Sequence, residues 1–162
     1  MKNLWAPWRK EFILSEKEKG CVFCNRLKQR NDKKNLILLR GKSCFVILNR
    51  FPYNSGHLMV SPKKHTGNLE KLKDAELLEL LKLTRISVKV LKEVFKPHGF
   101  NLGMNLEKVS GAGIADHLHI HVVPRWSGDT NFMPVLSDTK VVSISLDEAY
   151  RKLKKRFEKI VL

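Results

Sequence analysis

Three histidines alternate with aliphatic residues in the segment His117-Leu118-His119-Ile120-His121-Val122-Val123. This alternation indicates a β-strand, because successive side chains of a strand point to opposite faces of a sheet. His117, His119 and His121 therefore share one face, and the aliphatic side chains between them enter the core from the other. We expect a strand from His117 to Val123 that lines a site with three imidazoles.

The residues that precede this segment predict two strands and a long helix. Cys44–Leu48 and His57–Ser61 have strand character, and the turn-forming residues 49–56 join them as antiparallel neighbours. An amphipathic helix is expected at about residues 72–96, ended by Pro97. Its apolar positions follow helical spacing: Leu77, Leu80, Leu81, Thr84, Val88, Leu91 and Phe95.

Further elements surround the histidine segment. A strand is expected from Phe100 to Asn105, and a capping pattern at residues 145–148 predicts the start of a C-terminal helix. The charged stretch from Lys28 to Lys34 has the character of a loop. Since strands pair locally on both sides of one helix, we expect an α+β fold with an antiparallel sheet, rather than a doubly wound parallel sheet.

The length and composition favour one domain. The chain has 162 residues, of which 43% are hydrophobic, which suffices for one core. We divide it into an N-terminal extension (1–20), a core (21–135) and a C-terminal strand and helix (136–162). Because no apolar run approaches the length of a membrane span and the first residues lack a secretory apolar core, we expect a cytoplasmic protein that does not bind membranes.

The charge predicts an anionic partner without specifying it. Lysine and arginine total 31 against 16 acidic residues, a formal charge of +15. Such a field attracts phosphates, nucleic acid or anionic surfaces, although a solvated basic surface has the same composition.

The cysteines indicate a metal site or a redox pair. Three cysteines cannot all pair within one chain, so a disulfide framework is not expected. Cys21 and Cys24 have the two-residue gap that lets both thiolates converge on one metal ion, and Cys44 has the surroundings of a core residue. A thioredoxin-like role would require this motif in a βαβ unit, which the sequence does not predict.

Three aligned imidazoles favour catalysis over packing. Imidazole is neutral and nucleophilic near pH 7, which suits covalent phosphoryl or nucleotidyl transfer, whereas a three-histidine metal site is the other interpretation. Groups that bind phosphate lie just before the strand and favour the first interpretation: Asn105, Ser110 and the backbone amides near Gly111 and Gly113.

These residues resemble the histidine triad (HIT) family of nucleotide-binding hydrolases and transferases. The resemblance rests on the pattern from His117 to Val123 and extends over most of residues 20–135, through residues 48–57 and 60–65. Within the family, the chain is most similar to the diadenosine tetraphosphate phosphorylase-like branch. That similarity comes from Leu4-Trp5-Ala6-Pro7-Trp8-Arg9 and from the segment Val122 to Phe132.

The resemblance implies roles for individual residues. His119 is the nucleophile that attacks the α-phosphorus, and His121 contacts the phosphate and helps the leaving group depart. Asn49 holds the ribose hydroxyls, and Trp126 stacks on a second base or fills a dimer contact. Ile114 stands where several relatives carry a phosphate-binding serine, a role that Ser110 would have to fill.

The resemblance also implies zinc and a partner subunit. Relatives that bind zinc match this chain at Cys21, Cys24, His65 and His117, so the metal would tie the N-terminal segment to the sheet. No organic cofactor is expected, and the protein is predicted to be a homodimer that acts on dinucleoside polyphosphates, with phosphate or water as acceptor.

Two other functions remain open at the level of sequence. One is a nucleoside phosphoramidate hydrolase of the same family, which releases AMP from an amine-linked substrate. The other is a non-catalytic module that binds nucleotides or nucleic acid through the basic surface, although the predicted activity does not require nucleic acid.

Overall fold

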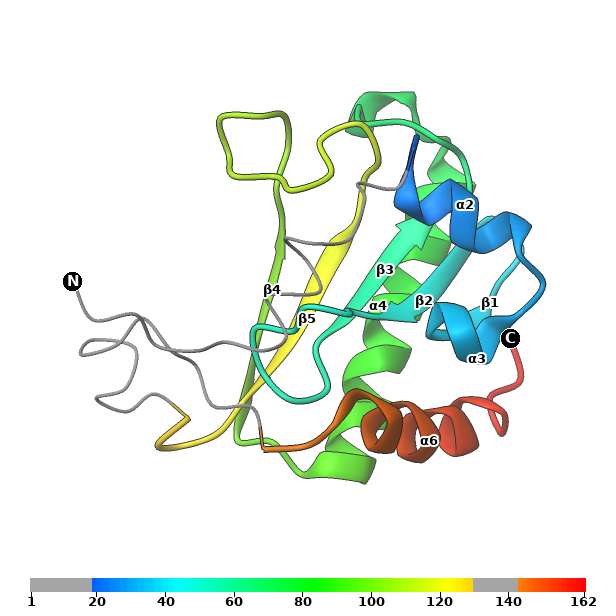
Figure 1. Cartoon of the computed structure of the whole chain (residues 1–162). Helices are drawn as coiled ribbons and strands as arrows, with labels where there is room; N and C mark the ends of the chain where they lie inside the picture. The colour runs from blue at the N-terminus through cyan, green and yellow to red at the C-terminus, as the bar shows by residue number, and fades with distance from the viewer. Residues whose placement is uncertain (1–18, 130–142) are drawn as a thin grey trace.

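The computed structural model describes residues 19–129 and 143–162 (Figure 1). The aromatic-rich segment 4–9, most of the predicted extension 1–20 and residues 130–142 lie outside the described residues. Residues 136–142 of the predicted C-terminal strand and helix are therefore not described. From residue 143 the chain leads into a helix.

A five-stranded antiparallel sheet forms the centre of the molecule. The strands follow the order β1-β2-β3-β5-β4 across the sheet, and each neighbouring pair is antiparallel. Their bounds are β1 Ile37–Arg40, β2 Cys44–Leu48, β3 Leu58–Pro62, β4 Gly99–Met104 and β5 Ile120–Arg125. The predicted α+β class with an antiparallel sheet is confirmed.

In the described parts of the chain, five helical segments accompany the sheet. Their bounds are α2 Val22–Lys28, α3 Asp32–Asn35, the 3-10 helix η1 Leu69–Lys71, α4 Asp74–Phe95 and α6 Leu146–Phe157. The predicted helix 72–96 corresponds to α4, and the predicted C-terminal helix to α6, whose Ser145 hydroxyl accepts a hydrogen bond from the Glu148 N–H.

The prediction of a loop from Lys28 to Lys34 is partly wrong, because residues 32–35 form α3. The Asn31 side chain accepts a hydrogen bond from the Lys34 N–H at 3.1 Å and so caps this short helix. Arg40 adds an ion pair with Asp32 at 2.7 Å, which ties the helix to β1.

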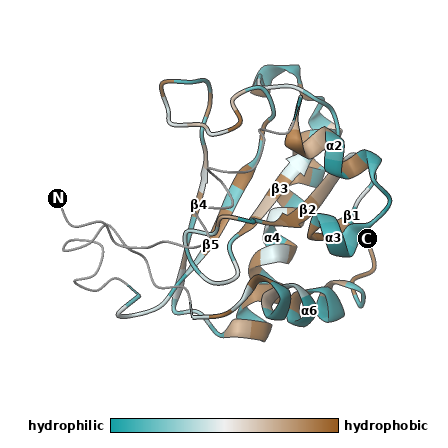
Figure 2. Ribbon diagram, in the orientation of Figure 1, coloured by the Kyte–Doolittle hydropathy of each residue, from teal (hydrophilic) through white to brown (hydrophobic). Residues whose placement is uncertain are grey.

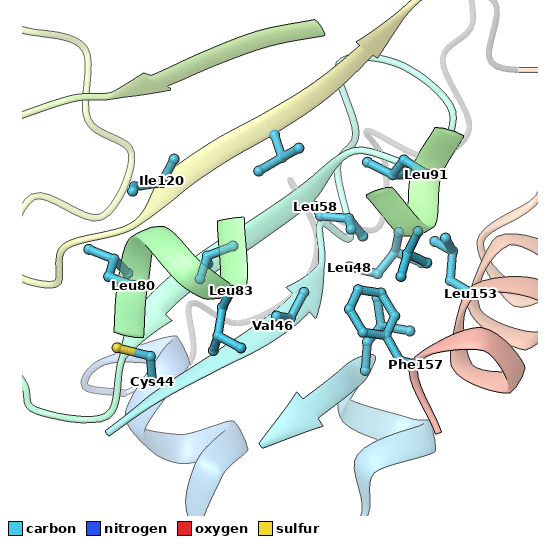
Figure 3. Close-up of a cluster of buried hydrophobic side chains, with 14 of the residues drawn as sticks. Cys44, Val46, Leu48, Leu58, Leu80, Leu83, Leu91, Ile120, Leu153 and Phe157 are labelled. Carbon is cyan, nitrogen blue, oxygen red and sulfur yellow. The ribbon is translucent and has the colours of Figure 1, made fainter. Parts of the chain in front are cut away.

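The main core lies between one face of the sheet and helices α4 and α6 (Figure 3). Leu83 of α4 and Leu153 of α6 are fully buried there. Leu81 was predicted to share the buried stripe of α4, but its side chain is 62% exposed. Leu80 and Leu91 are buried as predicted, and Leu83, which was not in the predicted stripe, is buried with them. Figure 2 shows how hydrophobic residues concentrate along the central strands.

The alternation of the histidine segment divides its side chains between the two faces as predicted. Leu118, Ile120 and Val122 all belong to the main core. The opposite face carries a second apolar cluster, formed by Phe23 of α2 with side chains from β1, β2 and β3. This second face also receives the histidines, since the Phe23 ring lies against those of His117 and His119.

The predicted strand start at His117 is wrong, because β5 begins at Ile120. Residues 117–119 make hydrogen bonds with the end of β3 and with the loop that follows it, rather than with a regular ladder. The Leu118 N–H donates to the Thr66 carbonyl at 2.8 Å, and the Ser61 hydroxyl donates to the Leu118 carbonyl at 2.7 Å. These two bonds hold the segment extended, so the alternation of side chains is kept.

Candidate active site

His119 is buried and its tautomer is set by the backbone. Its Nδ1 lies 2.9 Å from the carbonyl oxygen of His117. A carbonyl oxygen only accepts, so Nδ1 carries the proton and Nε2 keeps a free lone pair. Burial lowers the pKa of His119 against the opposing effect of this hydrogen bond. The neutral imidazole, which is the nucleophilic form, is therefore favoured at pH 7.

His121 lies beside His119 and forms a pair with His57. The rings of His119 and His121 are 4.7 Å apart between centroids, nearly perpendicular at 77°. His121 Nδ1 is 2.9 Å from Nε2 of His57, which is fully buried. Burial, with a smaller contribution from the charge of His119, lowers the pKa of His121 to about 4.

The hydrogen bonds of His57 fix where the protons of this pair lie. The Tyr53 N–H donates to His57 Nδ1 at 3.1 Å, and Asn49 Nδ2 lies 3.2 Å from the same atom. Because Asn49 Oδ1 accepts from the Phe51 N–H, Nδ2 is the amide atom that faces His57. In the neutral form His57 Nδ1 accepts, so its Nε2–H donates to His121 Nδ1. His121 consequently carries its own proton on Nε2.

The site thus places a nucleophile beside a hydrogen-bond donor. His119 offers a lone pair on Nε2, and the neighbouring His121 offers a proton on Nε2. The Tyr53 ring covers part of the pair, with centroids 4.8 Å from His57 and 5.7 Å from His121. Such an arrangement is suited to displacement at phosphorus, in which one group attacks and another donates a hydrogen bond to the leaving oxygen.

Four potential metal ligands meet on the same face of the sheet. The donor atoms of Cys21, Cys24, His65 and His117 all lie within 4.8 Å of one another. The sulfur of Cys21 is 3.2 Å from His117 Nδ1, the sulfur of Cys24 is 3.5 Å from His65 Nδ1, and the two Nδ1 atoms are 3.3 Å apart.

These separations fit a tetrahedral zinc ion. Zinc bonds of about 2.3 Å to sulfur and about 2.05 Å to nitrogen place S and N about 3.5 Å apart and two N atoms about 3.3 Å apart. His117 Nε2 donates to the Pro62 carbonyl at 2.8 Å, which leaves its Nδ1 lone pair free for a metal. The residues present therefore fit the metal that the sequence predicted.

The loop that follows β4 contains the predicted phosphate-binding residues. Asn105 comes directly after β4 and is half-buried. Ser110 and Gly113 are exposed in the turns of residues 107–116, where the Ser110 hydroxyl donates to the Glu107 carbonyl at 2.8 Å. Gly111 has a φ of 84°, a conformation that glycine adopts without strain. Ile114 packs on the Phe23 cluster, so it has an apolar role.

Trp126 follows β5 and is half-buried. The backbone N–H of Trp126 donates to the carboxylate of Asp129 at 3.1 Å. The structure therefore fixes the backbone of Trp126 close to the end of the histidine strand.

Sequence reasoning missed His57 and Tyr53 as members of the site. His57 was assigned only to a strand, although it stands just before β3, the strand that pairs with β5. The signal was the pairing itself, because Met59 lies opposite His121 and His57 is two residues away on the same face. Five of the six histidines thus lie in the triad site or the metal cluster.

This fold and this site define the histidine triad class of nucleotide hydrolases and transferases. The chain belongs to the HIT domain family, whose model matches residues 30–128. It is 38% identical to the AP-4-A phosphorylase of Mycobacterium tuberculosis, over 94% of this chain and 83% of that protein. It is also 30% identical to an uncharacterized HIT-like protein of Methanocaldococcus jannaschii, over 83% of this chain and 98% of the relative.

Solved structures share the fold. A hypothetical histidine triad nucleotide-binding protein from Sulfolobus tokodaii superposes with a TM-score of 0.66 and 27% identity, over 86% of this chain and 90% of that one. A Zn-bound histidine triad family protein from Mycobacterium smegmatis gives a TM-score of 0.68 at 24% identity, covering 86% and 94%. In the part of the chain that the structure describes, no helix is long and apolar enough to cross a membrane.

Proposed function

We propose that this protein cleaves dinucleoside polyphosphates such as diadenosine tetraphosphate through a covalent nucleotidyl-His119 intermediate. The observation that carries the proposal is the tautomer of His119, whose Nδ1 is bound to the His117 carbonyl so that Nε2 is a free nucleophile. The likeness to the AP-4-A phosphorylase over nearly the whole chain supports the substrate class.

In the first step, the lone pair of His119 Nε2 forms a bond to the α-phosphorus of the substrate. The bond from that phosphorus to the bridging oxygen breaks, and its electron pair leaves with ATP. The His121 Nε2–H donates a hydrogen bond to the departing oxygen, which leaves as the anion of ATP, and the neighbouring His57 keeps that tautomer in place. The product of this step is adenylylated His119.

In the second step, an oxygen of inorganic phosphate or water attacks the same phosphorus and the N–P bond breaks. Phosphate yields ADP, and water yields AMP. His119 Nε2 recovers its lone pair, and the proton that the attacking acceptor loses passes to solvent. Dividing the displacement in this way replaces one difficult step by two easier ones.

The nucleotide contacts belong to the same proposal. Asn105, the Ser110 hydroxyl and the amides near Gly111 and Gly113 would stabilise charge on the phosphate oxygens. Asn49 would hold the ribose, since one Oδ1 lone pair and one Nδ2 hydrogen remain beyond its bonds to Phe51 and His57. Trp126 would stack on the second base.

We also propose a structural zinc ion held by Cys21, Cys24, His65 and His117. Bound there, the ion supplies cross-linking rather than catalysis, because all four donors come from the protein and no position stays open for substrate. It would join α2, the loop after β3 and the segment before β5. Cys44, whose thiol pKa is raised to about 12 by burial, is not a ligand.

A homodimer is the proposed assembly. β4 lies at one end of the five-stranded sheet in the described part of the chain, and its Leu102 side chain is 53% exposed. An edge strand with exposed apolar area is a natural place for a second subunit to pair. Light scattering on the purified protein tests the assembly, and a monomer at every concentration would refute it. The cytoplasmic location stays a prediction of the sequence.

The deciding experiment is product analysis. Purified protein is incubated with diadenosine tetraphosphate, with and without inorganic phosphate, and the nucleotides are separated by chromatography. ADP plus ATP that form only with phosphate identify a phosphorylase, whereas AMP plus ATP without phosphate identify a hydrolase. No turnover in either condition rejects the dinucleotide substrate and directs the assay to nucleoside phosphoramidates.

Two variants test the nucleophile. His119→Ala should lose turnover and should not acquire the mass of one adenylyl group in a quenched reaction. His98→Ala is the matched control, because His98 is an exposed histidine that contacts Ser127, away from the triad. Equal activity in the wild type and His119→Ala would reject the covalent mechanism.

A further inference from the structure

The carboxylate of Asp129 is nearly buried, and both of its oxygens accept hydrogen bonds. Its side chain is 7% exposed, and it forms a two-pronged ion pair with Arg125, Nε to Oδ2 at 2.6 Å and Nη2 to Oδ1 at 2.8 Å. Arg125 also donates to Asn101 of β4 at 2.7 Å. The Arg125 guanidinium holds the pKa of Asp129 well below its usual range. The carboxylate is therefore ionised at neutral pH.

Asp129 also reaches the loop between β2 and β3. Asn54 Nδ2 donates to Asp129 Oδ2 at 2.7 Å and to the Pro124 carbonyl at 3.0 Å, and Asn54 itself is 6% exposed. A hydrogen bond to an ionised acceptor is about twice as strong as one between neutral groups. Asp129 thus anchors the tip of this loop to the end of β5.

The anchored loop is the one that holds His57. The Asn54 carbonyl accepts from the His57 N–H at 3.1 Å, and the Tyr53 N–H donates to His57 Nδ1 at 3.1 Å. The next bond in the series joins His57 to His121. A continuous path therefore runs from Asp129 through Asn54 and His57 to the imidazole that carries the Nε2 proton.

We infer that Asp129 is a positioning residue, which holds the loop of Tyr53 and Asn54 so that His57 keeps His121 in the Nε2-protonated tautomer. The inference rests on the proposed function, because it assigns Asp129 to the step in which the His121 Nε2–H donates a hydrogen bond to the leaving oxygen. Asp129 does not contact the reacting atoms. Its removal should lower kcat by misorienting a group that does.

Two variants and one control test this role. Asp129→Ala removes the anchor, and Asn54→Ala removes the bonds from the loop to Asp129 and to the Pro124 carbonyl while the ion pair between Arg125 and Asp129 stays. Asp32→Ala is the control, because it removes a carboxylate from an arginine ion pair of similar length at Arg40, remote from this path. The tautomers of His57 and His121 are read from long-range ¹H–¹⁵N correlations of the ring nitrogens.

In the wild type and the control, His57 and His121 should both show protonated Nε2 and unprotonated Nδ1. In both loop variants these signals should change to averaged tautomers, and kcat should fall about tenfold to a hundredfold. In Asn54→Ala, KM should stay near the wild-type value, because the Trp126 backbone keeps its bond to Asp129.

The outcomes distinguish a failure of the positioning role of Asp129 from a failure of the proposed function. Unchanged ring signals in both variants, or changed signals with undiminished kcat, would overturn the role of Asp129. A wild type without turnover would reject the proposed function, while the ring signals would still test the positioning. If Asp129→Ala does not fold, Asn54→Ala alone decides.

Discussion

His121 should make the stability of the protein depend on pH in the mildly acidic range. Its pKa falls from 6.5 to about 4 on folding, because burial and the charge of His119 disfavour the imidazolium. An unfolded chain therefore binds a proton at this position more readily than the folded protein does. Stability from this group is fully present above pH 6.5 and is lost as pH falls toward 4.

The size of the effect follows from the two pKa values. From about pH 7 to about pH 4.5, the unfolded state gains most of a proton at this site and the folded state gains about a quarter of one. Integrating that difference gives a loss of about 2 kcal/mol in the free energy of unfolding.

Urea denaturation of the wild type and His121→Gln, at several pH values in this range, measures the contribution. Glutamine does not titrate, so the titratable groups that do not contact His121 cancel in the difference between the two proteins. The wild type should lose about 2 kcal/mol more than the variant between about pH 7 and about pH 4.5. A difference that stays constant with pH would show that His121 titrates as it does in the unfolded chain and would refute the reasoning.

Three other substitutions, the first with Cys44→Ala as its control, test the site and the core. Cys24→Ala should abolish the zinc measured by elemental analysis and lower the melting temperature, whereas Cys44→Ala should keep the zinc. Leu83→Ala should lower the free energy of unfolding by about 2–5 kcal/mol in urea titrations, because it opens a cavity at a fully buried position. Gly67→Ala should destabilise by about 1–3 kcal/mol in the same titrations, since its Cβ would stand 2.4 Å from the Ala115 carbonyl oxygen.

Local patterns predicted most of the fold because each follows from a period of two or 3.6 residues. The alternation in residues 117–123 predicted correctly which side chains enter the core and which face the site. It placed the strand start three residues early, since hydrogen bonds to Thr66 and Ser61 keep residues 117–119 extended without a ladder. Alternation reports side-chain direction, whereas a strand boundary depends on its partners.

The parts that were missed depend on contacts between distant segments. β1 has only four residues, and its register with β2 shifts within the strand, so no period identifies it. His57 is 64 residues from His121 in the sequence, and only the pairing of β3 with β5 brings their rings together. A register of this kind could be proposed only after the two strands were known to be neighbours.

His117 links the proposed zinc site to the nucleophile through two different parts of the same residue. Its imidazole belongs to the metal cluster, whereas its carbonyl oxygen accepts the Nδ1 proton of His119. Substituting the side chain would remove the metal ligand but would leave the carbonyl that sets the tautomer. A loss of activity in His117→Ala would therefore reflect movement of the backbone once the ligand is gone. In that variant, the ¹H–¹⁵N correlations of the His119 ring would show whether Nδ1 still carries the proton.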